Sequence, residues 1–247
     1  MPHLVYMARA LALARQAEGG TWPNPMVGCV IVKDGRVIGE GFHHKPGQAH
    51  AELDALQNAG EPVRGSTVYV NLEPCCHHNK RTPPCAQRLI AEGVQRVVIA
   101  NEDPNPAVSG RGIGMLREAG IEVIADVLAQ EGELLNEVFF HNQRTQKPFV
   151  HLKLASTLDG KIAMADGQSQ WITGEAARLH AHRLRAGHMA IAVGAETLRQ
   201  DDPQLNVRLP GYDGPQPLRL VFSRTGNVPE TAQAFSDADA ARTQLLV

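Results

Sequence analysis

Residues 28–42 read GCVIVKDGRVIGEGF, in which two apolar runs flank the dipeptide Asp34-Gly35. Asp-Gly accepts the positive φ of a two-residue turn, and apolar runs on both sides of it are a strong signal for a β-hairpin. A helix is predicted before the hairpin, from Met7 to Ala17, because polar residues recur there at helical spacing. The chain is therefore expected to begin with a helix and a hairpin.

Downstream of the hairpin, helical and strand patterns alternate. The expected elements are a helix in HAELDALQNAG (50–60), a strand in STVYVNL (66–72), a helix in CAQRLIAEG (85–93), a strand in VQRVVIAN (94–101), a helix in GMLREAG (114–120), a strand in IEVIADV (121–127) and a helix from Glu131 to Arg144. This order predicts an α/β sandwich with a mixed sheet.

The stretch Thr145-Gln146-Lys147-Pro148 has the composition of a linker, so we divide the chain into domains over residues 1–146 and 147–247. The second domain is expected to contain a strand in FVHLKLAS (149–156), a turn at LDGK (158–161), a helix in GEAARLHAHRLRAG (174–187), a strand in MAIAVG (189–194), a short helix at the start of ETLRQDDPQLNVR (196–208) and a strand in PLRLVFS (217–223). The closing TQLLV (243–247) has the pattern of a buried strand, and we expect this domain to be incomplete.

Composition excludes several classes of protein. The 247 residues carry a formal net charge of −2, without the basic field of a non-specific nucleic-acid binder. No apolar run approaches the ~20 residues of a membrane span. Three of the four cysteines lie between positions 75 and 85, which favours metal binding or catalysis over a disulfide framework. We expect a cytoplasmic protein without nucleic-acid or membrane partners, and the sequence leaves a homo-oligomer open.

A motif typical of zinc enzymes lies in the first domain. HAE (50–52) precedes a predicted helix, and PC (74–75) and a later Cys85 follow it. H-x-E followed by P-C and a second cysteine is the signature of zinc-dependent deaminases. Zinc held by one imidazole and two thiolates keeps a position for water and lowers its pKa from about 15.7 toward about 7. The predicted ligands are His50, Cys75 and Cys85, and the predicted proton shuttle is Glu52.

The spacing of the two cysteines leaves other ligands open. Nine residues separate Cys75 from Cys85, where many deaminases have two. The loop between them offers Cys76, His77 and His78, and a Cys75-x-x-His78 pair has ordinary zinc spacing. We prefer Cys85 because it opens a predicted helix. Two alternatives to a catalytic zinc site are a closed structural zinc site and a metal-free cluster of buried cysteines.

Five motifs of the first domain carry a family resemblance: PNPMVGCVIV (23–32), HAE (50–52), LEPC (72–75), RTPPC (81–85) and DPNPAVSGRG (103–112). They resemble the bifunctional riboflavin-biosynthesis deaminase/reductase family. The resemblance implies a cytidine-deaminase-like α/β/α sandwich that deaminates a 2,5-diamino-6-(ribosylamino)pyrimidinone 5′-phosphate. The implied contacts to this phosphorylated pyrimidine are Asn24, His43, Asn105 and either Lys80 or Arg81. Asn24 and Asn105, each between two prolines, are also typical turn residues.

Five stretches of the second domain resemble the reductase partner of that family: KLASTLDGKIA (153–163), SQWIT (169–173), HRLRA (182–186), VGAETLRQDDPQLNVR (193–208) and LRLVFS (218–223). The resemblance implies a dihydrofolate-reductase-like α/β domain that uses NADPH to reduce the ribosyl group to ribityl. The positions matching NADPH contacts are Ala155, Trp171, Thr197, Asp201 and Ser223, and those matching substrate contacts are Ser169, Arg185, Leu205 and Arg208. Because members of this family have additional residues after the stretch that matches this chain, we expect deamination from this chain and reduction only from a full-length form.

Two other functions are compatible with the zinc motif. One is a nucleoside or tRNA deaminase of the same zinc fold, and the other is a non-catalytic zinc-binding scaffold. Aromatic residues make up 4% of the chain, which argues against the stacking groove of a strand-binding enzyme.

Overall fold

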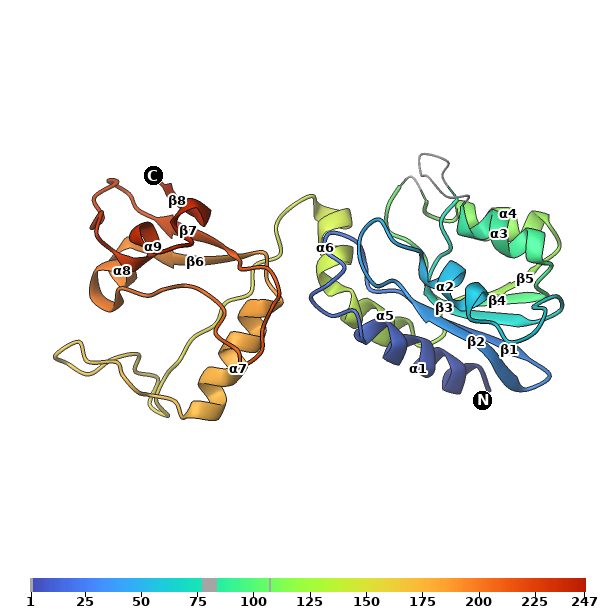
Figure 1. Ribbon diagram of the computed structural model, residues 1–247, viewed down its shortest axis with the longest axis horizontal. Helices are drawn as coiled ribbons and strands as arrows, with labels where there is room; N and C mark the ends of the chain where they lie inside the picture. Colours follow the sequence, from blue (N-terminus) through green and yellow to red (C-terminus); the bar gives the residue numbers. More distant parts are fainter. Residues whose placement is uncertain (1, 77–83, 107) are drawn as a thin grey trace. The chain divides into compact units, whose positions relative to one another are not determined.

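The computed structural model describes residues 2–76, 84–106 and 108–247. The chain forms two compact units, Met1–Val150 and His151–Val247, and each has its own sheet and core (Figure 1). No helix in the described part of the chain is long and apolar enough to cross a membrane. All four cysteines lie in described segments, and none is paired in a disulfide.

The first unit is built on a five-stranded sheet with the order β2-β1-β3-β4-β5. The strands are β1 (Gly28–Lys33), β2 (Arg36–Phe42), β3 (Thr67–Leu72), β4 (Arg96–Asn101) and β5 (Glu122–Ile124). β1 is antiparallel to β2 and to β3, whereas β3, β4 and β5 are parallel. Asp34 and Gly35 form the turn between β1 and β2 with φ of 49° and 74°, so the predictions of the hairpin and of the mixed sheet are confirmed.

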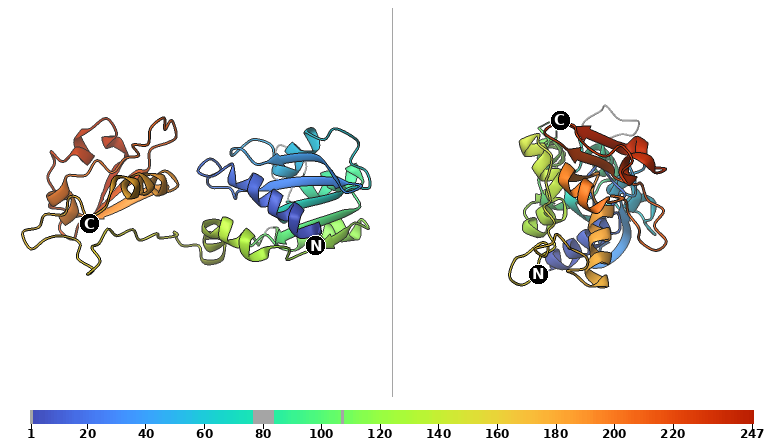
Figure 2. Two further views of the ribbon diagram at one scale, coloured as in Figure 1. Left: turned by 90° about the horizontal axis from the view of Figure 1, so that it is seen from below. Right: turned by 90° about the vertical axis from the view of Figure 1, so that its left-hand side faces the viewer.

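Helices cover both faces of this sheet. They are α1 (Pro2–Arg15), α2 (Ala51–Gln57), α3 (Cys85–Glu92), α4 (Arg111–Glu118), α5 (Ala129–Leu135) and α6 (Glu137–Thr145). One core joins α1 and α5 to the side chains of Val30, Tyr69 and Val98. The other joins α2, α3 and α4 to the opposite side of the same strands (Figures 1 and 2). The predicted α/β/α sandwich is confirmed.

The second unit contains a three-stranded parallel sheet with the order β6-β7-β8. Its elements are α7 (Glu175–Ala186), β6 (Ala190–Gly194), α8 (Ala195–Asp201), β7 (Leu218–Phe222), α9 (Gln233–Ser236), a 3-10 turn (Ala240–Arg242) and β8 (Thr243–Leu246). A small core forms on one face of the sheet around Leu198, Leu205 and Val221. The α/β class predicted for this region is confirmed.

The structure corrects two predictions in the first unit and two in the rest of the chain. The first helix begins at Pro2, five residues before the predicted start, because proline suits the first helical position. The helix predicted from Glu131 to Arg144 is two helices, since the backbone at Asn136 leaves helical geometry with φ of −112° and ψ of 28°.

The third correction concerns the predicted strand FVHLKLAS (149–156), which has no regular secondary structure. Its alternating side chains, those of Val150, Leu152 and Leu154, are all exposed. An alternating apolar pattern becomes a strand only where a neighbouring strand pairs with it, and the sheet of the second unit consists of β6, β7 and β8. The closing TQLLV is a strand as expected, but it lies at an edge and is partly exposed, not buried.

Candidate metal and catalytic site

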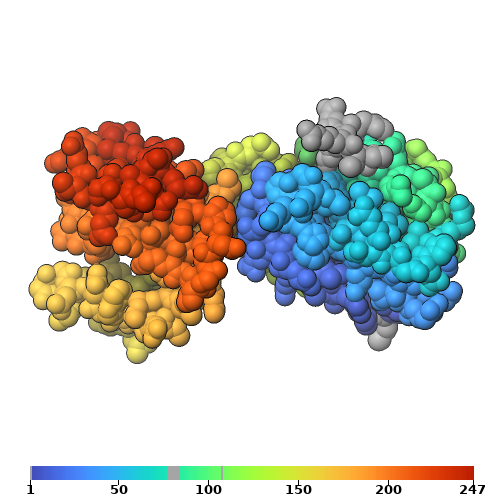
Figure 3. All heavy atoms as spheres, in the orientation of Figure 1, coloured from blue at the N-terminus to red at the C-terminus, as the bar shows by residue number. Residues whose placement is uncertain are grey.

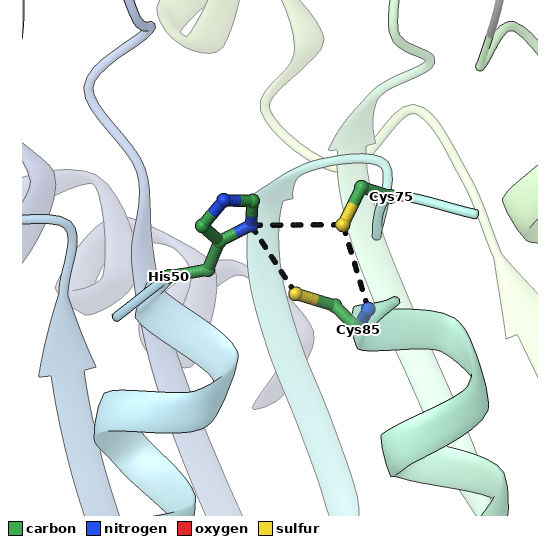
Figure 4. A group of neighbouring side chains, drawn as sticks. All are labelled: His50, Cys75 and Cys85. Carbon is green, nitrogen blue, oxygen red and sulfur yellow. Dashed lines mark hydrogen bonds between the residues drawn. The ribbon is translucent and has the colours of Figure 1, made fainter. Parts of the chain in front are cut away.

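Three element boundaries bring the predicted zinc ligands together (Figure 4). His50 is the residue before the first turn of α2, Cys75 follows the end of β3, and Cys85 is the first residue of α3. Pro84 precedes α3 with φ of −55°, so its ring directs the chain into the helix. Asp54 fixes α2 to the sheet, since its carboxylate accepts a hydrogen bond of 3.0 Å from the Phe42 amide. The ligand geometry therefore follows from how these elements begin and end.

The distances in this cluster suit a tetrahedral zinc ion. His50 Nδ1 lies 3.6 Å from Cys75 Sγ and 3.3 Å from Cys85 Sγ, and all three ligand atoms lie within 4.8 Å of one another. Zn–S bonds of about 2.3 Å and Zn–N bonds of about 2.0–2.1 Å place neighbouring ligand atoms of a tetrahedron about 3.5–3.8 Å apart. An imidazole with two thiolates is also a donor set that zinc prefers. The residues present therefore fit the ion.

Cys76, His77 and His78 are the alternative zinc ligands that the sequence left open. Cys76 is not in the cluster; it is buried, with its sulfur 4.0 Å from the Val108 carbonyl oxygen. His77 and His78 lie outside the described residues, as do Lys80 and Arg81, the candidate phosphate contacts.

The two cysteines of the cluster do not titrate alike. A hydrogen bond from the Cys85 thiol and, after it, the nearby His50 lower the pKa of Cys75 to about 3 despite its burial. The same hydrogen bond, together with burial and the neighbouring Glu52, raises the pKa of Cys85. The Cys85 amide also donates to Cys75 Sγ at 3.4 Å. A thiolate therefore forms first on Cys75.

Glu52 lies against this cluster. It is the second residue of α2 and its side chain is only 4% exposed. Burial, followed by the charge of Cys75, raises the pKa of Glu52, while His50 and a hydrogen bond with Cys85 act in the opposite direction. A raised pKa makes this carboxyl a better proton acceptor, so that it can both accept and return a proton.

Asn24 and His43 form a polar pair beside the cluster. The His43 ring is 5.5 Å from the His50 ring, edge to face. His43 Nδ1 is 2.9 Å from the Ala49 carbonyl oxygen, so this ring nitrogen is the donor. The other ring nitrogen, Nε2, then accepts a hydrogen bond of 3.0 Å from the side-chain amide of Asn24. The loop of residues 44–48, which connects β2 to α2, is exposed and belongs to the light-blue surface of the first unit in Figure 3.

Glu73 was not predicted, although it organises the loop that contains Asn105. This carboxylate is 3% exposed and accepts hydrogen bonds from the amides of Asp103, Gly110 and Ile113 at 3.2, 3.0 and 3.0 Å. The Asn105 amide in turn donates to Asp103 Oδ1 at 2.9 Å. An acidic residue between the apolar run TVYVNL and a Pro-Cys pair was the available signal, because a buried carboxylate needs donors.

The start of α4 also contacts the loop of Cys75 closely. A Cβ at Gly112 would lie 2.1 Å from the Pro74 carbonyl oxygen, so the two segments can approach only with glycine at this position. Asn105 itself accepts backbone hydrogen bonds from Val108 and Ser109, as a turn residue does. Cys75 and the Asn105 loop are thus held as one packed assembly.

The predicted NADPH contacts are distributed around the second unit. Trp171 is 70% exposed and lies under the guanidinium of Arg178, with 4.4 Å to the ring centroid. Ser223 is buried after β7, and its hydroxyl accepts from the Gly226 amide at 3.0 Å. The remaining three are Ala155, half-buried in the irregular stretch, and Thr197 and Asp201, both exposed on α8.

Two of the predicted reductase substrate contacts, Arg185 and Arg208, both bond to Asn206, Arg185 at its backbone carbonyl and Arg208 at its side-chain oxygen. Arg185 donates to the Asn206 carbonyl oxygen at 2.8 Å, and burial together with Arg208 lowers the pKa of Arg185. The Arg208 amide donates to His182 Nδ1 at 3.2 Å. Leu205, by contrast, is buried in the core at a φ of 51°, and Ser169 is half-buried.

Comparisons with known proteins find a matching protein family for each part of the chain. Residues 2–101 match the family model of the cytidine and deoxycytidylate deaminase zinc-binding region, and residues 148–246 match the RibD C-terminal domain. The chain is 48% identical over 243 residues to riboflavin biosynthesis protein RibD of Actinobacillus pleuropneumoniae, covering 98% of this chain and 64% of that protein. The structure of Acinetobacter baumannii RibD, form 1, matches with a TM-score of 0.90 at 45% identity, over 99% of this chain and 69% of that one. The chain belongs to the RibD family.

A second RibD-like structure describes the two activities in its name. It is a diaminohydroxyphosphoribosylaminopyrimidine deaminase/5-amino-6-(5-phosphoribosylamino)uracil reductase from Thermotoga maritima, with a TM-score of 0.89 and 43% identity over 99% of this chain and 68% of that one. This chain thus spans just under two-thirds of the Actinobacillus RibD and slightly more than two-thirds of each of these two structures.

Proposed function

We propose that the first unit catalyses the hydrolytic deamination of 2,5-diamino-6-(5-phosphoribosylamino)pyrimidin-4(3H)-one to 5-amino-6-(5-phosphoribosylamino)uracil in riboflavin biosynthesis. The observation that carries this proposal is the buried Glu52 carboxyl placed against the cluster of His50, Cys75 and Cys85. The RibD family membership and the name of the Thermotoga relative support the choice of substrate.

In this proposal His50, Cys75 and Cys85 hold zinc. The ion, when bound, supplies a Lewis acid that makes water nucleophilic near neutral pH. Glu52 accepts one proton as water attacks the carbon that bears the exocyclic amine, and it delivers this proton to the ring nitrogen. It then accepts the proton of the added hydroxyl and delivers it to the departing amine. Water is consumed, the carbon–nitrogen bond breaks, a carbonyl forms and ammonia leaves. The raised pKa of Glu52 suits this double role, because the same group must take and return the proton.

The substrate contacts of the first unit remain proposals. Asn24 and His43 are proposed to face the pyrimidine because they form a hydrogen-bonded pair next to His50. Asn105 is proposed for the same role on the loop held by Glu73. Lys80 or Arg81 is proposed for the phosphate, since a phosphate needs at least one cation.

Ammonia release separates this function from the nearest alternative. Purified protein is incubated in parallel with the pyrimidine phosphate, with cytidine and with tRNA. Release from the pyrimidine phosphate alone is expected, because the net charge of −2 and the 4% aromatic content do not suit a nucleic-acid groove. Release from cytidine or tRNA at a comparable rate contradicts the proposed substrate, and release from none of the three favours a zinc-binding scaffold.

For the second unit we propose that it takes part in NADPH-dependent reduction of the ribosyl group in a full-length form, with Arg185 and Arg208 as candidate contacts to the substrate anion. Their shared position at Asn206 supports that role. The test is NADPH oxidation with the deaminated product, which is expected from a full-length form; measurable oxidation by the 247-residue chain contradicts that expectation. We also propose that the protein is cytoplasmic, because the thiolate ligands of zinc require a reducing compartment.

A further inference from the structure

Two buried asparagines, Asn71 and Asn136, hold one backbone position near the proposed deaminase site. The side-chain oxygen of Asn136 accepts from the Met26 amide at 2.8 Å, and its side-chain nitrogen donates to the Met26 carbonyl oxygen at 2.9 Å. Asn71 donates to the same carbonyl oxygen at 3.1 Å and accepts from the Gly28 amide at 2.8 Å. Asn136 is 4% exposed and Asn71 is 1% exposed.

These bonds come from distant parts of the chain. Asn71 belongs to β3, and Asn136 stands at the junction of α5 and α6, 110 residues after Met26. The hydrogen bonds of Asn136 to Met26 explain why the helix predicted from Glu131 to Arg144 is interrupted at this residue. A buried side-chain amide that bonds both the backbone N–H and the backbone C=O of one residue restricts that residue strongly, because breaking either bond leaves an unpaired buried polar group.

The segment held in this way leads directly to the polar pair beside His50. Val27, the next residue, accepts a hydrogen bond from the His43 amide at 2.9 Å. Asn24, two residues before Met26, donates to His43 Nε2 at 3.0 Å. His43 is thus fixed through its backbone and its ring by the segment that the two asparagines hold.

We propose that Asn136, assisted by Asn71, is a positioning residue for substrate recognition, which sets Asn24 and His43 in place beside the proposed metal cluster. The proposal rests on the proposed function, because it takes Asn24 and His43 as contacts to the pyrimidine. Asn136 makes no step of the reaction itself. Its effect falls on substrate binding, whereas His50, Cys75 and Cys85 are attached to other elements and keep the metal.

The test uses N136D in the full chain. Aspartate still accepts from the Met26 amide, but it places an oxygen against the Met26 carbonyl. The expected result is a KM for the pyrimidine phosphate raised by about 10- to 100-fold, as follows a displacement of roughly 1 Å, with kcat and zinc content close to wild type. In a double-mutant cycle, N24A/N136D is expected to lose clearly less than the sum of the two single losses, because Asn136 acts in part through Asn24.

N58D is the matched control. Asn58 also donates from its side chain to a backbone carbonyl, that of Glu40 at 3.0 Å, but on the exposed side of β2. It should leave KM unchanged. An unchanged KM in N136D, the same rise in N58D, or additive losses in N24A/N136D overturns the proposal. Should N136D fail to fold, N71D makes the same chemical change at the same carbonyl and is expected to raise KM less, because Asn136 still bonds it.

Hydrogen exchange separates this proposal from the proposed function. In N136D, exchange at the amides of Met26 and His43 is expected to be at least about tenfold faster than in wild type, while the Phe42 amide, held by Asp54, stays protected. Unchanged protection at His43 overturns the positioning role whatever the substrate is. Faster exchange at His43 in a protein whose wild type releases no ammonia from the pyrimidine phosphate supports the positioning role and refutes the proposed substrate.

Discussion

The proposed sites of the two units differ in how their residues are held. In the first unit, Glu52 and both cysteine ligands are buried, and each lies within a few residues of a helix start or a strand end. In the second unit, Thr197, Asp201 and Trp171 are exposed, and the sheet has its core on one face. The proposed deaminase chemistry therefore requires only local geometry within one packed unit. The proposed cofactor site, whose side chains are exposed, depends on further groups that contact them.

The largest effect is expected from Glu52→Gln in the first unit. Glutamine keeps the shape of the side chain but cannot carry the proton, so turnover should fall by about 10²–10⁴-fold with one zinc per chain retained. Ammonia release and metal analysis of the same sample measure both quantities. Gln57→Glu, at the other end of α2, is the control and should leave turnover unchanged. Turnover of the Glu52 variant near the wild-type level would remove the carboxyl from the mechanism.

Asp237→Asn tests whether the second unit can be weakened without affecting the first. Arg219 has a side chain only 1% exposed and forms two hydrogen bonds of 2.8 Å with Asp237. Loss of the charged partner should lower the free energy of unfolding of this unit by about 1.5–3 kcal/mol. Ammonia release should not change. A parallel loss of deamination would contradict the independence of the two sites.

The same pair predicts a pH dependence with a definite sign. Hydrogen bonds from Arg219 lower the pKa of Asp237 in the folded unit. Its contribution to stability is therefore complete above the unfolded pKa of about 3.9 and disappears as the pH falls through the folded value. Acid unfolding of wild type and Asp237→Asn should converge below about pH 4. Curves that stay parallel down to lower pH would show that Asp237 contributes nothing by its charge.

A smaller effect is expected from Glu73→Gln. Glutamine places an NH₂ group where the carboxylate accepted from backbone amides, so at least one of three hydrogen bonds is lost at a cost of about 1–3 kcal/mol. The Asn105 loop should loosen and KM should rise by less than in N136D. Glu118→Gln, exposed at the end of α4, serves as the control. Equal stability and KM in both variants would show that Glu73 does not hold this loop.

Local sequence patterns were sufficient to predict most helices and strands of the first unit. The Asp34-Gly35 turn, the prolines before Cys85 and the short apolar runs each specify their element through neighbouring residues. The same locality explains why HAE and PC suggested the metal cluster: His50 and Cys75 stand at element boundaries that the sequence marks.

The structural features that the sequence did not predict depend on contacts between residues far apart in the chain. The interruption at Asn136 follows from two hydrogen bonds to Met26, and the buried carboxylate of Glu73 depends on amides 30 to 40 residues later. The predicted strand at 149–156 failed for the same reason, because a strand needs a neighbour that periodicity does not supply. The domain boundary at 146/147 stays a prediction, beside a division of the structure at 150/151.

Bound-metal stoichiometry in two cysteine variants tests the proposed zinc site most directly. Cys85 lies in the cluster with His50 and Cys75, whereas the Cys76 sulfur lies near the Val108 carbonyl. Zinc is measured by elemental analysis of purified wild type, Cys85→Ser and Cys76→Ser. One zinc per chain is expected in wild type and in Cys76→Ser, with loss of zinc and of ammonia release in Cys85→Ser. Zinc retained in Cys85→Ser and lost in Cys76→Ser would contradict the assigned ligands.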